Sequence, residues 1–261
     1  MRERQQRAVA ELPAELARRV VWWDALPDAF DARVIGNEVL DAMPVQLLVR
    51  DAQGWSERGV EVAPDGALRW ADRAGASAPR ATMAQLPVGS VTEVHRVAQG
   101  FIATLGARLR RGVALFIDYG FPAAEYDHAQ RVGGTLRCHR AHRAHDDPLW
   151  QPGLSDITAH VDFSGVARAA RDAGLELLGY TSQARFLLNC GLLDVLGDAL
   201  RELPGGVAAP SDRAGVQLAA GVQKLVNESE MGELFKVIAL GRGVATPLAG
   251  FAAGDRSAAL A

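Results

Sequence analysis

Short apolar runs that end in polar residues constrain the fold of this 261-residue chain more than any other feature. Arg33–Gly36 leads into Asn37-Glu38, and Val113–Ile117 leads into Asp118-Tyr119. Between these runs, apolar residues recur at helical spacing over Val91–Leu109. A strand, a helix and a second strand in this order form the crossover unit of a parallel sheet, whose strands are apolar because both faces are buried.

Further elements extend this α/β pattern. The predicted elements are a helix over Arg2–Arg19 interrupted at Pro13, buried strands at Val20–Trp23, Leu175–Thr181 and Phe235–Leu240, a helix over Asp162–Ala173 with Asp162 as N-cap, a largely helical stretch Gln183–Leu203 with a break near Gly191, and a helix over Asp212–Val226. The motif S-x-x-E at Ser90–Glu93 is a capping box, and it predicts the start of the crossover helix.

We assign residues 1–243 to one domain of alternating strands and helices. Two segments within this domain, and the residues that follow it, depart from the pattern. Residues 45–72 contain the turn sequence Pro64-Asp65-Gly66 between apolar runs, so we expect an inserted antiparallel β-meander there. Residues 121–162 are long and irregular, and we expect them at the edge of an active site. Residues 244–261 are rich in Ala and Gly and are predicted to form a flexible tail.

Composition excludes several classes of protein. The formal net charge of -3 does not favour binding to nucleic acid or to an anionic membrane surface. No apolar run reaches the roughly 18 residues that a membrane span needs. The two cysteines make no disulfide framework and fit a reducing compartment. We therefore predict a cytoplasmic protein.

The stretch Val34–Val45 is a candidate site because a strand there runs directly into Asn37, Glu38 and Asp41. In open α/β sheets, ligands bind beyond the carboxyl ends of the strands. The alternative is a capped strand-to-helix turn, in which Asn37 or Asp41 only satisfies backbone donors.

Trp23 and Asp24 close the first predicted strand. An aromatic ring followed by an acid at a strand's carboxyl edge could hold an adenine, with the acid accepting from the exocyclic amine. Equally, the tryptophans could be core residues and Asp24 a cap.

Cys138, His139, His142 and His145 invite a zinc interpretation. Three histidines at i, i+3 and i+6 beside a cysteine make a poor tetrahedral set, and no second pair of ligands at short spacing occurs elsewhere in the chain. We therefore predict no metal. A thiol nucleophile at Cys138 has no orienting third group in the sequence.

Four stretches together resemble a known family. They are VIGNEVLDAMPV (34–45), LFIDYGFPAAEY (115–126), GGTLRCHRAHRAHDDPLWQPGLSDITAHVDF (133–163) and GYTSQARFLLNCG (179–191). The chain is similar over about residues 1–243 to the MidA-like family of S-adenosylmethionine-dependent methyltransferases. Mitochondrial members of that family assist assembly of respiratory complex I by methylating an arginine of one of its subunits.

The resemblance implies a class I methyltransferase fold, with a mostly parallel, Rossmann-like sheet and helices on both faces. It places Trp23, Asp24 and Asn37 at the cofactor and makes Asn37, Glu38 and Asp41 the catalytic group. The cofactor is expected to be S-adenosylmethionine and the partner a protein substrate. A homodimer is left open.

One departure from the family concerns its first two strands and its glycine-rich loop, which should precede residue 1 and are expected to be missing. The alternative function is therefore a non-catalytic assembly or adaptor protein, formed by a truncated or degenerate methyltransferase that binds a partner protein.

The predicted mechanism is transfer of a methyl group to an arginine guanidinium. Glu38 is expected to bind and orient the guanidinium, with Asp41 or Asn37 assisting, because carboxylates match its planar fork of donors. The residues expected to line the substrate side are Asp118, Tyr119, His160 and Asp162.

Overall fold

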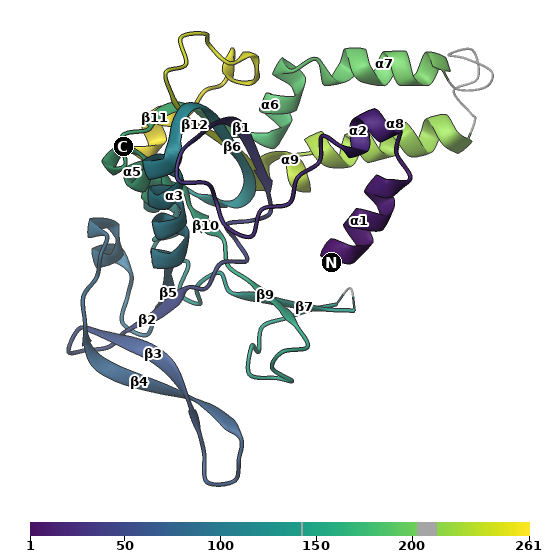
Figure 1. The fold of residues 1–261 in the computed structure, drawn as a ribbon. Helices are drawn as coiled ribbons and strands as arrows, with labels where there is room; N and C mark the ends of the chain where they lie inside the picture. Colours follow the sequence, from purple (N-terminus) through teal and green to yellow (C-terminus); the bar gives the residue numbers. More distant parts are fainter. Residues whose placement is uncertain (142, 203–212) are drawn as a thin grey trace.

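The structure is a computed structural model that describes residues 1–141, 143–202 and 213–261. Its helices are α1 (Arg2–Ala10), α2 (Ala14–Ala17), α3 (Arg96–Arg108), α4 (Ala123–Tyr126), α5 (Phe163–Asp172), α6 (Gln183–Asn189), α7 (Leu192–Glu202), α8 (Arg213–Val226) and α9 (Met231–Leu234), with short 3-10 turns η1 (Ala81–Gln85), η3 (Ala249–Phe251) and η4 (Ser257–Leu260). Figure 1 shows a central sheet from which two separate parts of the chain extend, one built of strands and one of helices.

The central sheet contains β1 (Phe30–Asn37), β6 (Leu109–Phe121), β12 (Phe235–Arg242) and β11 (Glu176–Ser182), in the order β1-β6-β12-β11. A short strand, β10 (Val161–Asp162), pairs in parallel with the end of β6. β1 is also parallel to β6, whereas β12 is antiparallel to both β6 and β11. β12 is therefore the one reversed strand among these five, and the prediction of a mostly parallel sheet is confirmed.

Side chains that alternate along β6 form two cores, one on each face of the sheet. Ala114 and Phe116 belong to the core beneath α3 and α5, whereas Leu115 and Ile117 pack against the smaller core beneath α6 and η3. The prediction of helices on both faces is confirmed. β1 is an edge strand, and its Ile35 is 73% exposed because no described element covers it.

The inserted meander is present, and it is larger than predicted. Its strands are β2 (Gln46–Arg50), β3 (Trp55–Val62), β4 (Leu68–Ala76) and β5 (Val91–Val94), in the order β4-β3-β2-β5. The prediction of a capping box at Ser90–Glu93 is wrong, because this stretch pairs with β2 and satisfies its backbone groups as a strand. The crossover helix α3 begins only at Arg96.

The segment 121–162 is less irregular than predicted. It contains α4 and a small sheet of β7 (Arg137–Arg140), β8 (Arg143–His145) and β9 (Asp156–Thr158), in the order β8-β7-β9. These strands were missed because they are short and polar. This small sheet covers one end of the central sheet, where the candidate site lies.

Two further predictions are wrong. Val20–Trp23 is not a strand, and Val21 and Trp23 are 69% and 54% exposed, because no described strand pairs with this run. Residues 244–261 are not frayed, since Phe251 and Leu260 are buried against the central sheet and the Asp255 carboxylate accepts a hydrogen bond from the Tyr180 amide at 3.0 Å. A segment rich in small residues packs here because it covers apolar sheet surface.

Apart from the start of α3, the helical predictions hold for the described ranges. α1 and α2 are separated near Pro13, and α6 and α7 are separated at Gly191, which has a φ of 84°. Leu203 and Asp212, predicted as helix ends, lie outside the described residues. None of the helices in the described ranges has the length and apolar character needed to cross a membrane.

Candidate active site

A cavity of about 420 Å³ opens beside the carboxyl ends of β1 and β6. Glu38, Asp41, Tyr119 and His160 line it, although they are far apart in the sequence. The two strands are parallel neighbours with Asn37 in register with Ile117, so the residues that follow them meet at one edge of the sheet. Four of the predicted site residues therefore lie around one cavity, whereas Asn37, Asp118 and Asp162 do not line it.

The turn after β1 holds Glu38 in an unusual backbone conformation. Glu38 has a φ of 50°, in the left-handed region that non-glycine residues rarely adopt. Its amide donates to the Ile117 carbonyl at 2.9 Å, and its carboxylate accepts from the Asn37 side-chain amide at 3.1 Å. The turn thereby holds an exposed carboxylate at the mouth of the cavity, while Asn37 does not line the cavity itself.

Asp118 lies beneath this turn and holds it in place. Its Oδ2 accepts from the amides of Val39, Leu40 and Asp41 at 3.2, 2.9 and 3.3 Å. Burial, together with the nearby Asp41 carboxylate, raises the pKa of Asp118 to about 7. Asp118 was predicted to contact substrate, but it does not line the cavity and acts as a cap for the turn.

Asp41 lines the cavity and has one buried oxygen without a partner. The Tyr119 hydroxyl donates to Asp41 Oδ2, whereas Asp41 Oδ1 is buried and has no hydrogen-bond partner among the described residues. Burial and the Asp41 carboxylate raise the pKa of Tyr119 well above its usual value, so the phenol stays protonated and donates. A buried carboxylate oxygen left unpaired is costly, and it favours a ligand that donates a hydrogen bond.

Aromatic rings form the opposite wall. The Tyr119 ring packs edge-on against His160 and Phe235, with centroids 5.2 and 5.4 Å apart. The pKa of His160 is lowered to about 4, first by burial and then by the positive charges of Arg131 and Arg137 among others. His160 is therefore neutral at neutral pH.

Other residues of the cavity were not predicted as site residues. Arg137, His139, Asp156 and Thr158 come from β7 and β9, and Phe235 begins β12. The small sheet of β7, β8 and β9 places the first four, and its short polar strands have no apolar periodicity to reveal them. Their placement required the tertiary structure.

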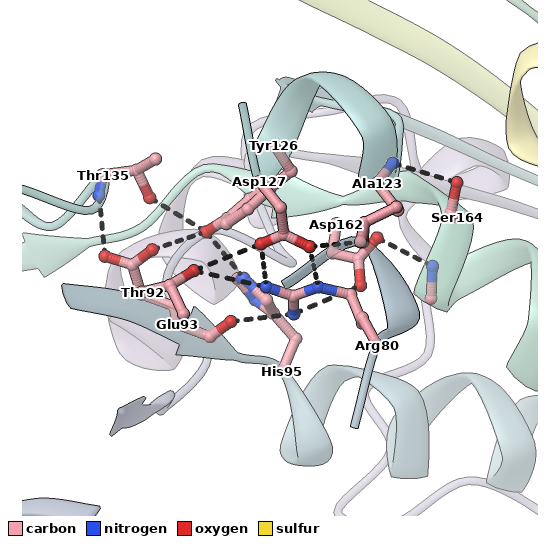
Figure 2. Close-up of polar contacts among 12 residues, drawn as sticks. Arg80, Thr92, Glu93, His95, Ala123, Tyr126, Asp127, Thr135, Asp162 and Ser164 are labelled. Atoms are coloured by element: carbon pink, nitrogen blue, oxygen red, sulfur yellow. Dashed lines mark hydrogen bonds and ion pairs between the residues drawn. The ribbon is translucent and has the colours of Figure 1, made fainter. Parts of the chain in front are cut away.

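Asp162 lies outside the cavity, in a separate cluster of buried polar residues (Figure 2). As predicted, it caps α5, and its Oδ1 accepts from the Gly165 amide at 2.9 Å. Arg80 lies 3.7 Å from its other oxygen and makes two hydrogen bonds to Asp127, at 2.8 and 2.6 Å. Arg80, Asp127 and Asp162 thus form a buried ionic core that no sequence motif predicted.

Glu93 completes this cluster. Its carboxylate accepts from the amides of Thr135 and Leu136 at 2.7 and 3.1 Å and from the Tyr126 hydroxyl at 2.8 Å (Figure 2). The Thr135 hydroxyl oxygen in turn accepts from the His160 amide at 3.0 Å. The cluster therefore holds His160, which lines the cavity, in position.

Trp23 and Asp24 lie outside the cavity. Asp24 accepts a hydrogen bond from Arg2 at 2.6 Å, and the Trp23 ring packs against Phe30 with centroids 6.1 Å apart. Their role at a cofactor stays a prediction. Among the described residues, no strand of the central sheet is followed by a glycine-rich loop and a covering helix, and contact of Asn37 with the cofactor stays a prediction as well.

Cys138 and His139, considered above as metal ligands, do not point to one common site. Cys138 is buried, and the neighbouring His139 of the same strand faces the cavity, as expected for alternate sides of β7. Burial raises the pKa of the Cys138 thiol, which disfavours a thiolate. Within the described ranges no group of three or more ligating side chains could hold a metal ion, and His142 lies outside them.

The order of the central sheet, its single reversed strand and a cavity at the carboxyl ends of β1 and β6 define a class I methyltransferase fold. A family model described as "Putative S-adenosyl-L-methionine-dependent methyltransferase" matches residues 1–181. The chain belongs to this family of S-adenosylmethionine-dependent methyltransferases.

Solved structures and curated relatives agree with this assignment. A crystal structure from Burkholderia thailandensis, bound to S-adenosyl-homocysteine, is 52% identical with a TM-score of 0.89, covering 98% of this chain and 65% of that one. Protein arginine methyltransferase NDUFAF7, mitochondrial, is 33% identical in Homo sapiens and 32% identical in Mus musculus, over 79% and 85% of this chain. These matches cover 44% and 49% of the relatives, so the chain spans about half their length.

Proposed function

We propose that the protein containing this chain transfers a methyl group from S-adenosylmethionine to an arginine side chain of a substrate protein. The observation that carries the proposal is the set of carboxylates around the cavity, Glu38, Asp41 and Asp156. The unpaired Oδ1 of Asp41 requires a donor, and a guanidinium offers several in a planar fork. The names of the curated relatives support this choice of acceptor.

The cofactor supplies, when bound, a methyl group on a sulfonium. The residues of this chain hold the acceptor. Asp41 binds one edge of the guanidinium through Oδ1 while Tyr119 keeps the carboxylate in position, and Tyr119 and Phe235 exclude water from one side. Exchange of an N–H proton for a methyl group releases that proton, and Glu38, exposed at the cavity mouth, is placed to accept it.

The test is Glu38→Gln in the protein that contains this chain, with Glu61→Gln as the matched control on an exposed strand. Cofactor binding is measured by calorimetry, and transfer by mass spectrometry of methylarginine in an arginine peptide. We expect the first variant to bind the cofactor and to transfer methyl about a hundredfold more slowly, because the carboxylate that accepts the released proton is lost. Transfer at the wild-type rate would remove Glu38 from the mechanism. Absence of cofactor binding by the wild-type protein would favour a non-catalytic adaptor.

A protein substrate, the absence of nucleic-acid and membrane partners, a homodimer and a cytoplasmic location all stay predictions. The curated relatives carry the word mitochondrial in their names. Fractionation of cells that express the tagged protein decides its location.

A further inference from the structure

A second cavity of about 400 Å³ lies next to the candidate active site. Arg137 and His160 line both cavities, so the two are direct neighbours. The second cavity runs between the meander, represented by Arg58 and Trp70, and the segment 131–137. We call the two cavities together the charged groove.

The two ends of the charged groove carry opposite charge. Glu38, Asp41 and Asp156 line the first cavity together with Arg137, which leaves it a net negative charge. Arg58, Arg131 and Arg137 line the second cavity together with Glu93 and Asp146, which leaves it a net positive charge. This separation of charge is not a property of the whole surface, because the chain has a net charge of only -3. A ligand that fits it carries a cation at one end and an anion at the other.

Of the three arginines, Arg131 is the one available to a ligand. Arg58 makes two hydrogen bonds to Asp72, each of 2.8 Å, and Arg137 is paired with Asp146. Arg131 has no ion-pair partner among the described residues, and its buried Nε has no hydrogen-bond partner. A guanidinium whose positive charge is not compensated by a carboxylate favours binding of an anion.

Arg131 is also held in place before any ligand binds. Its guanidinium carbon lies 4.2 Å from the centroid of the Phe121 ring, and Phe121 packs against His160 at 5.2 Å. The side chain therefore loses little conformational freedom on binding. The positive field of Arg131 and Arg137 reaches the first cavity, since both lower the pKa of His160.

We infer that the charged groove binds an extended segment of the substrate protein, with the target arginine in the first cavity and an acidic side chain of the same segment against Arg131. The inference rests on the proposed function for the cationic end. In an extended segment each residue advances about 3.3 Å, so the acidic residue stands a few positions from the arginine. The enzyme would thus select arginines that have an acidic neighbour in the sequence.

Binding of short fluorescein-labelled peptides, followed by anisotropy, tests this selection. One peptide has a central arginine with glutamates a few positions away, and its matched partner has glutamines there. We expect the acidic peptide to bind about tenfold more tightly, as a charge-assisted hydrogen bond contributes. Arg131→Gln should abolish the difference. Arg69→Gln should keep it, because Arg69 is paired with Asp65 at 2.9 Å and does not line the charged groove.

Each of the other outcomes refutes a stated part of the inference. Equal affinity of the two peptides for the wild-type protein, or no binding of either, refutes the anionic end of the charged groove. A preference that persists in Arg131→Gln refutes the role of Arg131. A third peptide, with glutamine in place of the arginine, separates the two proposals: if it binds as tightly as the acidic peptide, the inference survives and the arginine acceptor of the proposed function fails.

Discussion

Two groups of carboxylates in this protein differ in how fully they are paired. Around Arg80, the carboxylates of Asp127 and Glu93 accept hydrogen bonds at both of their oxygens, from charged or neutral donors (Figure 2). At the cavity, Asp41 keeps one oxygen without a partner, and Glu38 is held in a left-handed conformation.

The difference separates residues that stabilise the fold from residues that await a ligand. Buried polar groups are normally hydrogen-bonded, so a cluster with many internal bonds joins elements firmly. Asp162 Oδ2 makes no hydrogen bond, but it lies 3.7 Å from the Arg80 guanidinium, which compensates its charge. The Arg80 cluster joins the segment before η1 with β5, α4 and α5. A carboxylate oxygen without a partner beside a cavity does not stabilise the fold until a ligand donates a hydrogen bond to it. We therefore expect mutations in the two groups to affect different measurements.

The largest effect is expected from Arg80→Met. Arg80 is 5% exposed, and its loss leaves Asp127 and Asp162 buried without their cation. The free energy of unfolding, measured in urea, should fall by about 3–5 kcal/mol. The matched control is Arg110→Met, which removes an exposed pair with Asp31 and should cost less than about 1 kcal/mol. Similar losses in both variants would show that the buried cluster is not stabilising.

Asp41→Asn should have the opposite profile. The amide oxygen can still accept from Tyr119, so the free energy of unfolding should change by less than about 1.5 kcal/mol. Affinity for an arginine peptide should fall about tenfold, because the negative charge that pairs with the guanidinium is lost. Anisotropy and urea unfolding measure the two effects. A large loss of stability with unchanged affinity would place Asp41 among the structural residues.

Dependence of stability on pH should also distinguish the two groups. The pKa of Asp118 is raised from 3.8 to about 7, so its contribution is fully present below about pH 4 and is lost as pH rises toward 7. The pKa of His95, in the Arg80 cluster, is lowered from 6.5 to about 3, so its contribution is present above pH 6.5 and is lost as pH falls toward 3. The two contributions oppose each other in the native protein.

Urea unfolding at a series of pH values between about 4 and 7 separates these contributions. Asp118→Asn should make stability rise more steeply with pH, and His95→Gln should make it fall more steeply with pH. Each change in slope is at most about 1.4 kcal/mol per pH unit. Parallel profiles for the wild type and both variants would contradict the assignment.

The smallest effect is expected from Asp24→Ala, at a site that belongs to neither group. The side chain is 88% exposed in its pair with Arg2, so the free energy of unfolding should change by less than about 0.5 kcal/mol. Calorimetry with S-adenosylmethionine on the same variant tests whether Asp24 contacts the cofactor, as predicted from the sequence. Unchanged affinity would remove it from the site.

Local patterns in the sequence were sufficient for the strands β1, β6, β11 and β12 of the central sheet, for the parallel pairing of β1 with β6 and for the polar residues that follow their apolar runs. Apolar runs stop abruptly before Asn37, which ends β1, and before Asp118, after which β6 continues to Phe121. Parallel strands bring the residues after these runs to one edge of the sheet. The grouping of Glu38, Asp41, Tyr119 and His160 followed from this rule and from the family resemblance.

Only the tertiary structure decided what each polar residue does, because that depends on partners distant in the sequence. Glu93 resembles a helix cap locally, yet it bonds to Thr135 and Leu136. Asp118 resembles a ligand, yet its carboxylate is occupied by the turn after β1. No sequence motif marks Arg131. Its stacking on Phe121 within the charged groove exists only once β6 and the segment 131–137 are folded together. Whether a polar residue is paired, buried or left without a hydrogen-bond partner is a property of the folded chain. These properties separate structural residues from functional ones.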